Sequence, residues 1–247
     1  MEEGKGGDAM RNAYYIAKRE LGAYFSSPIA YVVTAVYLAV VGGLSGFILY
    51  YTREATMRYV LAHPVTVLFL VLVTQVVTMR LLAEEQRSGT LEPLLTSPVR
   101  DWEVVVGKFA ASLCLLLAMI LLTAYIPIVL VRLGRPDIGP ILAGYLGYAL
   151  MGAALLSIGV FASSVTQSQI VAAVVGIGIV LLLWLSSGLT EVVGDTLKGI
   201  VEYLPIFGHY SDMLRGVIDT KDIIYYLSVT MLFLFLSTRV LESRRWK

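Results

Sequence analysis

The chain has 247 residues, of which 57% are hydrophobic and 15% are charged, and its formal net charge is +1. A soluble domain carries roughly a quarter charged residues, because its surface must face water. The composition therefore excludes an ordinary water-soluble domain, and the net charge gives no support for nucleic-acid binding. The single cysteine, Cys114, excludes an internal disulfide and a metal site built on cysteines.

Charged residues divide the chain into apolar stretches that predict membrane-spanning helices. A charge at the bilayer centre is costly, and a helix needs roughly 20 apolar residues to cross about 30 Å of hydrocarbon. The charge-free stretch 138–190 would be about 80 Å long as one helix at ~1.5 Å per residue, so it must turn back at the polar residues 163–169. We therefore predict an all-α integral membrane protein with six transmembrane helices near 30–51, 59–79, 109–131, 141–163, 170–190 and 222–239.

The segment before the first span, residues 13–27, is predicted to lie on the membrane rather than in it. Apolar and aromatic residues recur there at helical spacing on one face, charged residues 18–20 are nearby, and Pro28 ends the segment. This pattern predicts an interfacial elbow helix, and the alternative is a first membrane helix that starts early. The apolar face consists of Tyr14, Ala17, Leu21, Tyr24 and Phe25.

The sequence reveals no energy source within the chain. No predicted span carries Asp, Glu, Lys or Arg in its interior, although ion-driven transporters usually need one. A P-loop is excluded because Gly107 and Lys108 are followed by Phe109. In the second helix, Thr74, Gln75 and Thr78 are candidates for lining a pathway, and polar packing between helices is the competing interpretation.

A Gly-x-Ser-Gly pattern at residues 43–46 matches intramembrane serine proteases. Such chemistry would need a histidine to activate Ser45, and the two histidines, His63 and His209, each lie near a predicted outer boundary. Small residues within a span more often permit close helix packing, so we favour packing over proteolysis.

The predicted cytoplasmic loop 80–108 is the most informative segment. It continues the second helix and breaks at Ser88 and Gly89, and Thr90 is a natural N-cap for a short new helix that Pro98 follows. The leucines on one face of that helix would be exposed unless they dock into a groove on a partner, so we favour docking over a solvated turn. The predicted docking residues are Glu84, Glu85, Gly89, Thr90, Leu91, Glu92, Leu94, Leu95 and Pro98.

Basic residues set the predicted orientation. With both termini in the cytoplasm, twelve of the 19 lysines and arginines fall on the cytoplasmic side, as the positive-inside rule expects. The segment 191–222 then lies outside, where its apolar pairs and scattered charges predict one or two short helices on the outer leaflet.

The loop residues 84–98 (EEQRSGTLEPLLTSP) resemble the signature of ABC-2 type transporter permeases. Further stretches resemble the gliding-motility-type branch, which is similar to the nitrous-oxide-reductase maturation permeases: 24–29 (YFSSPI), 159–164 (GVFASS) with 169–172 (QIVA), and 215–220 (RGVIDT). The resemblance covers residues 12–242, nearly the whole chain.

The resemblance implies a permease subunit, not an enzyme, in the cytoplasmic (inner) membrane of a prokaryote. It implies three partners besides the lipid bilayer: an ATP-binding cassette subunit that carries ATP and Mg, a second permease copy or a homologous permease, and an auxiliary extracytoplasmic subunit near 191–222. No cofactor, metal or catalytic residue is expected in this chain. The expected function is ATP-driven export, and the alternative is a mechanical or assembly role in which nothing crosses the membrane.

Overall fold

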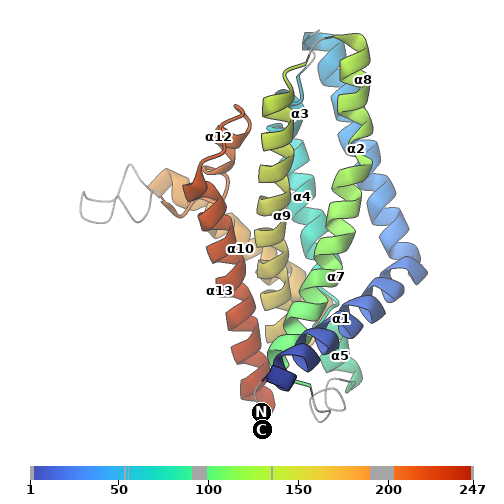
Figure 1. The fold of residues 1–247 in the computed structure, drawn as a ribbon, viewed down its shortest axis with the longest axis vertical. Helices are drawn as coiled ribbons and strands as arrows, with labels where there is room; N and C mark the ends of the chain where they lie inside the picture. Colours follow the sequence, from blue (N-terminus) through green and yellow to red (C-terminus); the bar gives the residue numbers. More distant parts are fainter. Residues whose placement is uncertain are drawn as a thin grey trace.

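The computed structural model describes residues 3–52, 54, 56–90, 99–134, 136–189 and 203–245, and these residues form helices and connecting turns without a strand. Six helical segments are long and apolar enough to cross a membrane, and they form an elongated bundle (Figure 1). The predicted all-α class with six spans is thus confirmed. The spans are Pro28–Thr52, Pro64–Ser88, Asp101–Arg132, Ile138–Val165, Gln169–Ser186 and Thr220–Arg244.

The first helix, α1 (Glu3–Ser26), runs obliquely across one end of the bundle (Figure 1). It is separate from α2 (Pro28–Thr52), because the chain turns at Ser27 and proline occupies the first position of α2, where its missing N–H has no helical partner to lose. α1 begins well before residue 13, the predicted start of the elbow. We call the end of the bundle that carries α1 the basal end, and the opposite half the distal half.

The predicted second span, 59–79, is divided into α3 (Arg58–Leu61) and α4 (Pro64–Thr78), and α5 (Ala83–Ser88) follows in the predicted loop 80–108. The first break precedes Pro64, and His63 caps the new helix because its Nδ1 accepts the Val65 N–H at 3.2 Å. The second break, at residues 79–82, redirects α5 at the basal end.

The third span begins at Asp101, eight residues before its predicted start at 109, and consists of α7 (Asp101–Leu122) and α8 (Tyr125–Leu133). Pro127 explains the break, since it has no N–H for the carbonyl of Thr123. The Thr123 carbonyl instead accepts the Ile126 N–H at 2.9 Å and the Tyr145 hydroxyl at 3.1 Å.

The remaining helices are α9 (Ile138–Val165), α10 (Gln169–Leu189), α12 (Tyr210–Met213) and α13 (Thr220–Arg245). The chain turns between α9 and α10 within the predicted polar turn, and α12 lies in the predicted outer segment. α9 forms the core: 67% of its apolar window is buried, against 22% for α2, 22% for α10 and 17% for α13. Most of the surface of these outer helices is therefore left for lipid or for another subunit.

Candidate functional site at the basal end

A glycine brings α1 and α7 close together at the basal end. A Cβ at Gly107 would lie 2.8 Å from the Ala13 carbonyl oxygen and 2.9 Å from the Ile16 side chain. A residue with a side chain would therefore push the two helices apart. This close crossing places the next residue of α7, Lys108, against α1.

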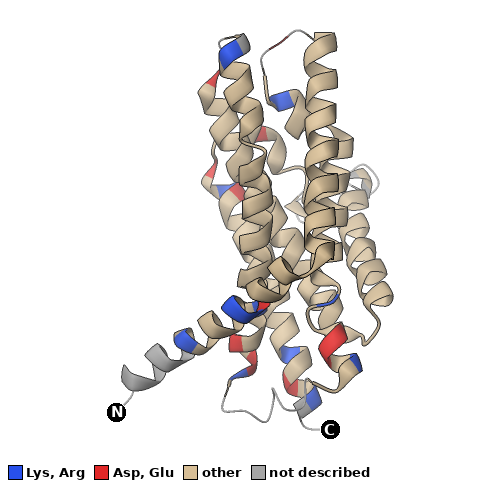
Figure 2. Cartoon of the chain, turned by 90° about the vertical axis from the view of Figure 1, so that its right-hand side faces the viewer, with Lys and Arg blue, Asp and Glu red and all other residues tan. Residues whose placement is uncertain are grey.

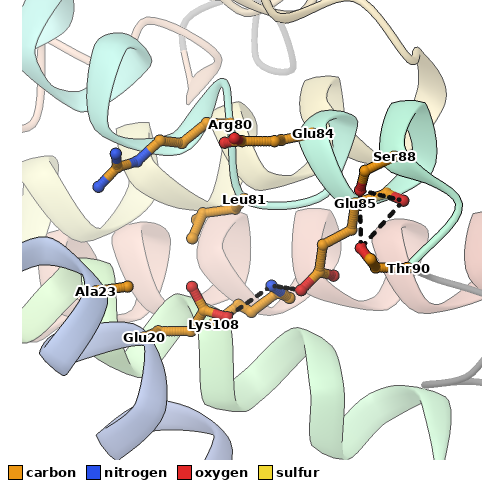
Figure 3. Close-up of a pocket in the computed structure, with 9 residues that line it drawn as sticks. All are labelled: Glu20, Ala23, Arg80, Leu81, Glu84, Glu85, Ser88, Thr90 and Lys108. Carbon is orange, nitrogen blue, oxygen red and sulfur yellow. Dashed lines mark hydrogen bonds and ion pairs between the residues drawn. The ribbon is translucent and has the colours of Figure 1, made fainter. Parts of the chain in front are cut away.

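The side chain of Lys108 joins three helices. Its ammonium donates to Glu20 Oε1 on α1 at 2.9 Å and to Glu85 Oε1 on α5 at 2.8 Å (Figure 3). Only 1% of the Lys108 side chain is exposed, and the two carboxylates are largely covered. We call Lys108, Glu20, Glu85 and the neighbouring Arg19 the charged junction.

Charge compensation makes this burial tolerable. The exposed guanidinium of Arg19 donates to Glu20 at 3.0 Å and to Glu85 at 3.1 Å, so two cations face two carboxylates. Burial alone would raise the pKa of Glu20, but the charges and hydrogen bonds of Lys108 and Arg19 outweigh it and lower that pKa. The Glu20 carboxylate is therefore held as an anion at neutral pH, and removing one partner would leave a buried charge unpaired.

Two further contacts fix α1 on the bundle. Asn12 donates to Glu103 Oε2 at 3.1 Å near the start of α7. At the other end of α1, the Tyr24 hydroxyl donates to the Val77 carbonyl at 3.0 Å, and the Arg80 guanidinium lies 4.8 Å from the centre of the Tyr24 ring. These contacts join α1 to α7 and to the α4–α5 segment along its length.

A serine on α9 sets the direction of α5. The Ser163 hydroxyl donates to the Met79 carbonyl and accepts the N–H groups of Leu82 and Ala83, each at 3.0 Å. These are backbone groups that the break between α4 and α5 leaves without helical partners. In the next turn, Gln86 donates to the Ser164 carbonyl at 2.9 Å. α5 is therefore attached to α9 as well as to Lys108.

An open pocket of about 350 Å³ lies beside the charged junction (Figure 3). Within the described part of the chain, Glu85 Oε2 is buried here and has no hydrogen-bond partner. Five of the nine residues that line the pocket carry a charge. It is lined by Glu20, Ala23, Arg80, Leu81, Glu84, Glu85, Ser88, Thr90 and Lys108.

The structure describes four of the predicted docking residues. Glu84 is exposed and lines the pocket, and Glu85 belongs to the charged junction. Gly89 ends α5 in a left-handed conformation (φ 72°), as the predicted break requires, and Thr90 Oγ1 lies 2.8 Å from Ser88 Oγ. The docking helix itself stays a prediction, because the other predicted residues lie outside those described: Leu91, Glu92, Leu94, Leu95 and Pro98.

The structure divides the predicted elbow face. Ala17 and Leu21 pack partly buried against the core, and Tyr24 is 2% exposed. Tyr14 and Phe25 flank this contact and are exposed, with 63% and 57% of their surface accessible. The inner part of the face thus binds the bundle, which leaves two aromatic rings at its edges for the lipid interface.

The pathway candidates are buried inside the bundle. Thr74, Gln75 and Thr78 are at most 1% exposed. Both threonine hydroxyls donate to carbonyls of α4 itself, while Gln75 donates to the Leu155 carbonyl of α9 at 3.2 Å. Within this chain they serve packing between helices, and their role in a pathway stays a prediction.

The protease interpretation gains no support from the described residues. The Ser45 hydroxyl donates to the Gly42 carbonyl at 2.7 Å, a local bond within α2. The two imidazoles are engaged elsewhere, His63 with the Val65 N–H and His209 with Asp222. The structure therefore brings no histidine to Ser45 in the part of the chain that it describes.

Sequence reasoning missed three residues of the site: Glu20, Lys108 and Ser163. Lys108 ends the predicted loop 80–108, because a lysine is expected to end an apolar span, whereas α7 continues through it. Ser163 lies in the predicted polar turn and in the stretch 159–164, and neither feature indicates a bond to the backbone between α4 and α5. The available signal was the pair Gly107 and Lys108, a small residue beside a cation on a helix that otherwise reads as apolar.

A family model described as "ABC-2 family transporter protein" matches residues 9–244. The match spans nearly the whole chain, including most of α1, the charged junction and every candidate span. A search of curated proteins finds no significant match.

Proposed function

Because the chain belongs to the ABC-2 transporter family, we propose that it exports cargo across the cytoplasmic membrane of a prokaryote as one half of a dimeric permease. Family membership makes it a multi-pass membrane permease subunit of an ABC transporter. A separate ATP-binding cassette subunit would bind ATP and Mg and dock on the basal end. The proposed branch is the gliding-motility or nitrous-oxide-maturation type, as the shorter sequence stretches suggest.

The charged junction is the observation that carries this proposal. α5 leads directly into the predicted docking segment, and Lys108 ties α5 to α1 and α7 through ion pairs of 2.8 and 2.9 Å. Ser163 ties the start of α5 to α9, the helix at the centre of the bundle. A force that a partner applies at α5 would thus reach α1, α7 and α9 through these polar contacts.

In the proposed mechanism, closure of the ATP-bound partner subunits pushes on the docking segment and moves α5. The junction then transmits the movement to α1 and α7, while Ser163 transmits it to α9. Such a stroke shifts the permease between inward and outward states only if the contacts differ between those states. Lys108 provides such a contact, because its ammonium can exchange carboxylate partners without leaving the junction.

The proposed orientation places the basal end in the cytoplasm. α1 begins and α13 ends at this end of the bundle, and Lys and Arg residues gather around both (Figure 2). Arg244 also donates to the Val165 carbonyl at 2.8 Å, so the last turn of α13 caps the end of α9 there. Basic residues beside the membrane favour the cytoplasmic face.

A pull-down with an ATPase assay tests the proposal. The tagged full-length permease is purified from its own cells in mild detergent, with and without a non-hydrolysable ATP analogue. Proteins that bind to it are identified by mass spectrometry, and the ATPase activity of the complex is measured. We expect an ATP-binding cassette subunit whose capture is lost when Leu94 and Leu95 are both changed to Asp. Leu204→Asp, an exposed position of the distal half, is the control and should retain the partner. Capture of no nucleotide-binding partner would overturn the proposal.

The alternative function is mechanical: the same ATPase stroke acts on an extracytoplasmic partner and nothing crosses the membrane. One observation favours it. Val217 and Ile218 are 56% and 52% exposed on the turn that follows Gly216, in the distal half where an auxiliary subunit would bind. Reconstitution of the complex into vesicles with a fluorescent phospholipid separates the two functions for lipid-like cargo. ATP-dependent transfer of the label between leaflets supports export, whereas ATP hydrolysis without transfer supports the mechanical role.

A further inference from the structure

The distal half holds a histidine–aspartate pair that the transport mechanism does not use. His209 Nδ1 lies 2.7 Å from Asp222 Oδ1, and His209 Nε2 lies 3.2 Å from the Tyr203 carbonyl oxygen. The ring stacks on Tyr225, with a centroid distance of 4.0 Å and an interplanar angle of 20°. The side chains of His209 and Asp222 are 10% and 1% exposed, so little water reaches the pair.

The two contacts require two hydrogens on the imidazole and the carboxylate together. A neutral imidazole beside an ionised carboxylate has only one, so the pair must bind one more proton. The Tyr203 carbonyl only accepts, so Nε2 must carry a hydrogen. The contact between Nδ1 and Oδ1 also needs a hydrogen, which belongs either to an imidazolium or to a carboxylic acid. In both arrangements the pair of His209 and Asp222 has no net charge. Loss of the proton leaves one buried negative charge and one broken hydrogen bond.

Within the described residues, the surroundings offer little to compensate that charge. Tyr225 and Tyr226 face the imidazole, and their hydroxyls donate to the carbonyls of Leu204 and Ile206 at 2.7 and 2.8 Å. Asp222 Oδ2 is buried without a hydrogen-bond partner among the described residues. The charged groups nearby are exposed and arranged in two ion pairs, Lys221 with Asp219 and Arg215 with Asp212.

The pair joins α13 to the segment that carries α12. Asp222 is in the first turn of α13, and His209 directly precedes α12. α12 in turn sits on α9 at a glycine: a Cβ at Gly147 would lie 2.6 Å from Met213 Sδ and 3.0 Å from Tyr210 Cδ2. The contact between His209 and Asp222 therefore lies directly before the residues by which α12 packs on α9.

We propose that His209 and Asp222 form a proton-dependent latch that holds α12 against α9. Protonation closes the latch, and deprotonation releases the His209 end of the segment so that α12 leaves the notch at Gly147. The latch is therefore sensitive to the pH of the medium on its side of the membrane. In the orientation proposed above, that medium lies outside the cell, although the latch itself does not depend on the orientation.

Hydrogen–deuterium exchange of the full-length protein in nanodiscs tests the latch. Exchange is followed by mass spectrometry for peptides within 203–222 at pH 5.5 and 8.5, after correction for the pH dependence of intrinsic exchange. We expect about fivefold faster corrected exchange at pH 8.5, the effect of losing roughly one hydrogen bond. His209→Gln and Asp222→Asn should each reduce this pH dependence, because the contact at this position is then no longer held by a proton shared between an imidazole and a carboxylate. The double variant His209→Gln with Asp222→Asn leaves no titratable group at the contact and should abolish the pH dependence.

The control is Asp219→Asn, which removes an exposed charge three residues from Asp222 and should keep the pH response of the unchanged protein. The double variant His209→Gln with Asp222→Asn places two uncharged polar side chains at the contact. It keeps the proposal testable if one of the single variants does not fold. The proposal is overturned if the unchanged protein shows equal corrected exchange at both pH values. It is also overturned if His209→Gln retains the full pH dependence.

Discussion

Lys108 donates to Glu85 over 2.8 Å and thereby joins α7 to α5, although the two residues lie 23 positions apart in the chain. The same ammonium donates to Glu20, which lies 88 positions away in the chain. One buried cation thus bridges carboxylates from two other helices, and its removal changes the contacts of all three helices together.

Lys108→Met is expected to destabilise the protein by about 2–4 kcal/mol, because it leaves two largely buried carboxylates facing each other with only the exposed Arg19 between them. The same variant should weaken coupling, so that the complex hydrolyses ATP without transport. Thermal unfolding in detergent measures the first effect, and ATPase and transport assays on one preparation measure the second.

Two further variants separate charge from packing at this position. Arg19→Gln, which changes a side chain that is 58% exposed, should cost less than about 1 kcal/mol. The triple variant Lys108→Met, Glu20→Gln, Glu85→Gln removes the unpaired charges and should regain most of the stability while coupling stays weak. Equal losses of stability in the single and triple variants would contradict the electrostatic explanation.

The sequence predicts the number of spans because each charge-free stretch is long enough for one helix, and a helix in lipid must satisfy its own backbone. The turn between α9 and α10 follows from the same reasoning, since residues 138–190 are too long for one crossing. The break at Gly89 is also predictable, because the residue that ends α5 adopts a left-handed conformation that favours glycine.

The charged junction cannot be predicted in this way. Whether a lysine ends a helix or is buried within it depends on carboxylates that tertiary structure brings to it, and Glu20 is distant in the sequence. Ser163 illustrates the same limit, because its role depends on where α4 breaks on another helix. The local pattern of apolar and charged residues thus locates the helices, whereas the charged junction depends on pairing between polar residues that are distant in the sequence.

Ser163→Ala is expected to destabilise the junction between α4 and α5 by about 2–3 kcal/mol. The substitution removes the hydroxyl that serves the Met79 carbonyl and two N–H groups, and all three lie in a buried region. Ser211→Ala is a suitable control, because that hydroxyl is exposed and bonds locally to the Gly208 carbonyl. Unfolding in detergent should show a large loss for the first variant and almost none for the second; similar losses would contradict the proposed role of Ser163.

Gly176→Ala and Gly178→Ala form a matched pair on α10. A Cβ at Gly176 would collide with Oε1 of Gln75, which cannot move freely because its Nε2 donates to the Leu155 carbonyl. A Cβ at Gly178 meets nothing within 4 Å. We expect Gly176→Ala to cost about 1–3 kcal/mol, and Gly178→Ala to be neutral or to stabilise by up to about 1 kcal/mol through helix propensity.

Thermal unfolding measures both glycine variants, and Gln75→Ala provides the internal check. In a protein that already carries Gln75→Ala, the collision partner is gone, so Gly176→Ala should lose most of its cost. An unchanged cost in that background would show that Gln75 does not limit the approach of α10 to α4.

The last prediction concerns Pro127 and Tyr145. Pro127 deprives the Thr123 carbonyl of the donor four residues on, and the carbonyl accepts the Ile126 N–H at 2.9 Å and the Tyr145 hydroxyl at 3.1 Å instead. Tyr145→Phe should therefore cost about 1 kcal/mol in the unchanged protein, within the range measured for hydrogen bonds between membrane helices. With Pro127→Ala, the alanine N–H can bond to the Thr123 carbonyl and close the helix, so Tyr145→Phe should cost roughly half as much or less. A double-mutant cycle by unfolding in detergent gives this coupling directly. A cost of Tyr145→Phe that is the same in both backgrounds would mean that the hydroxyl serves only the Thr123 side chain, whose Oγ1 lies 3.0 Å away.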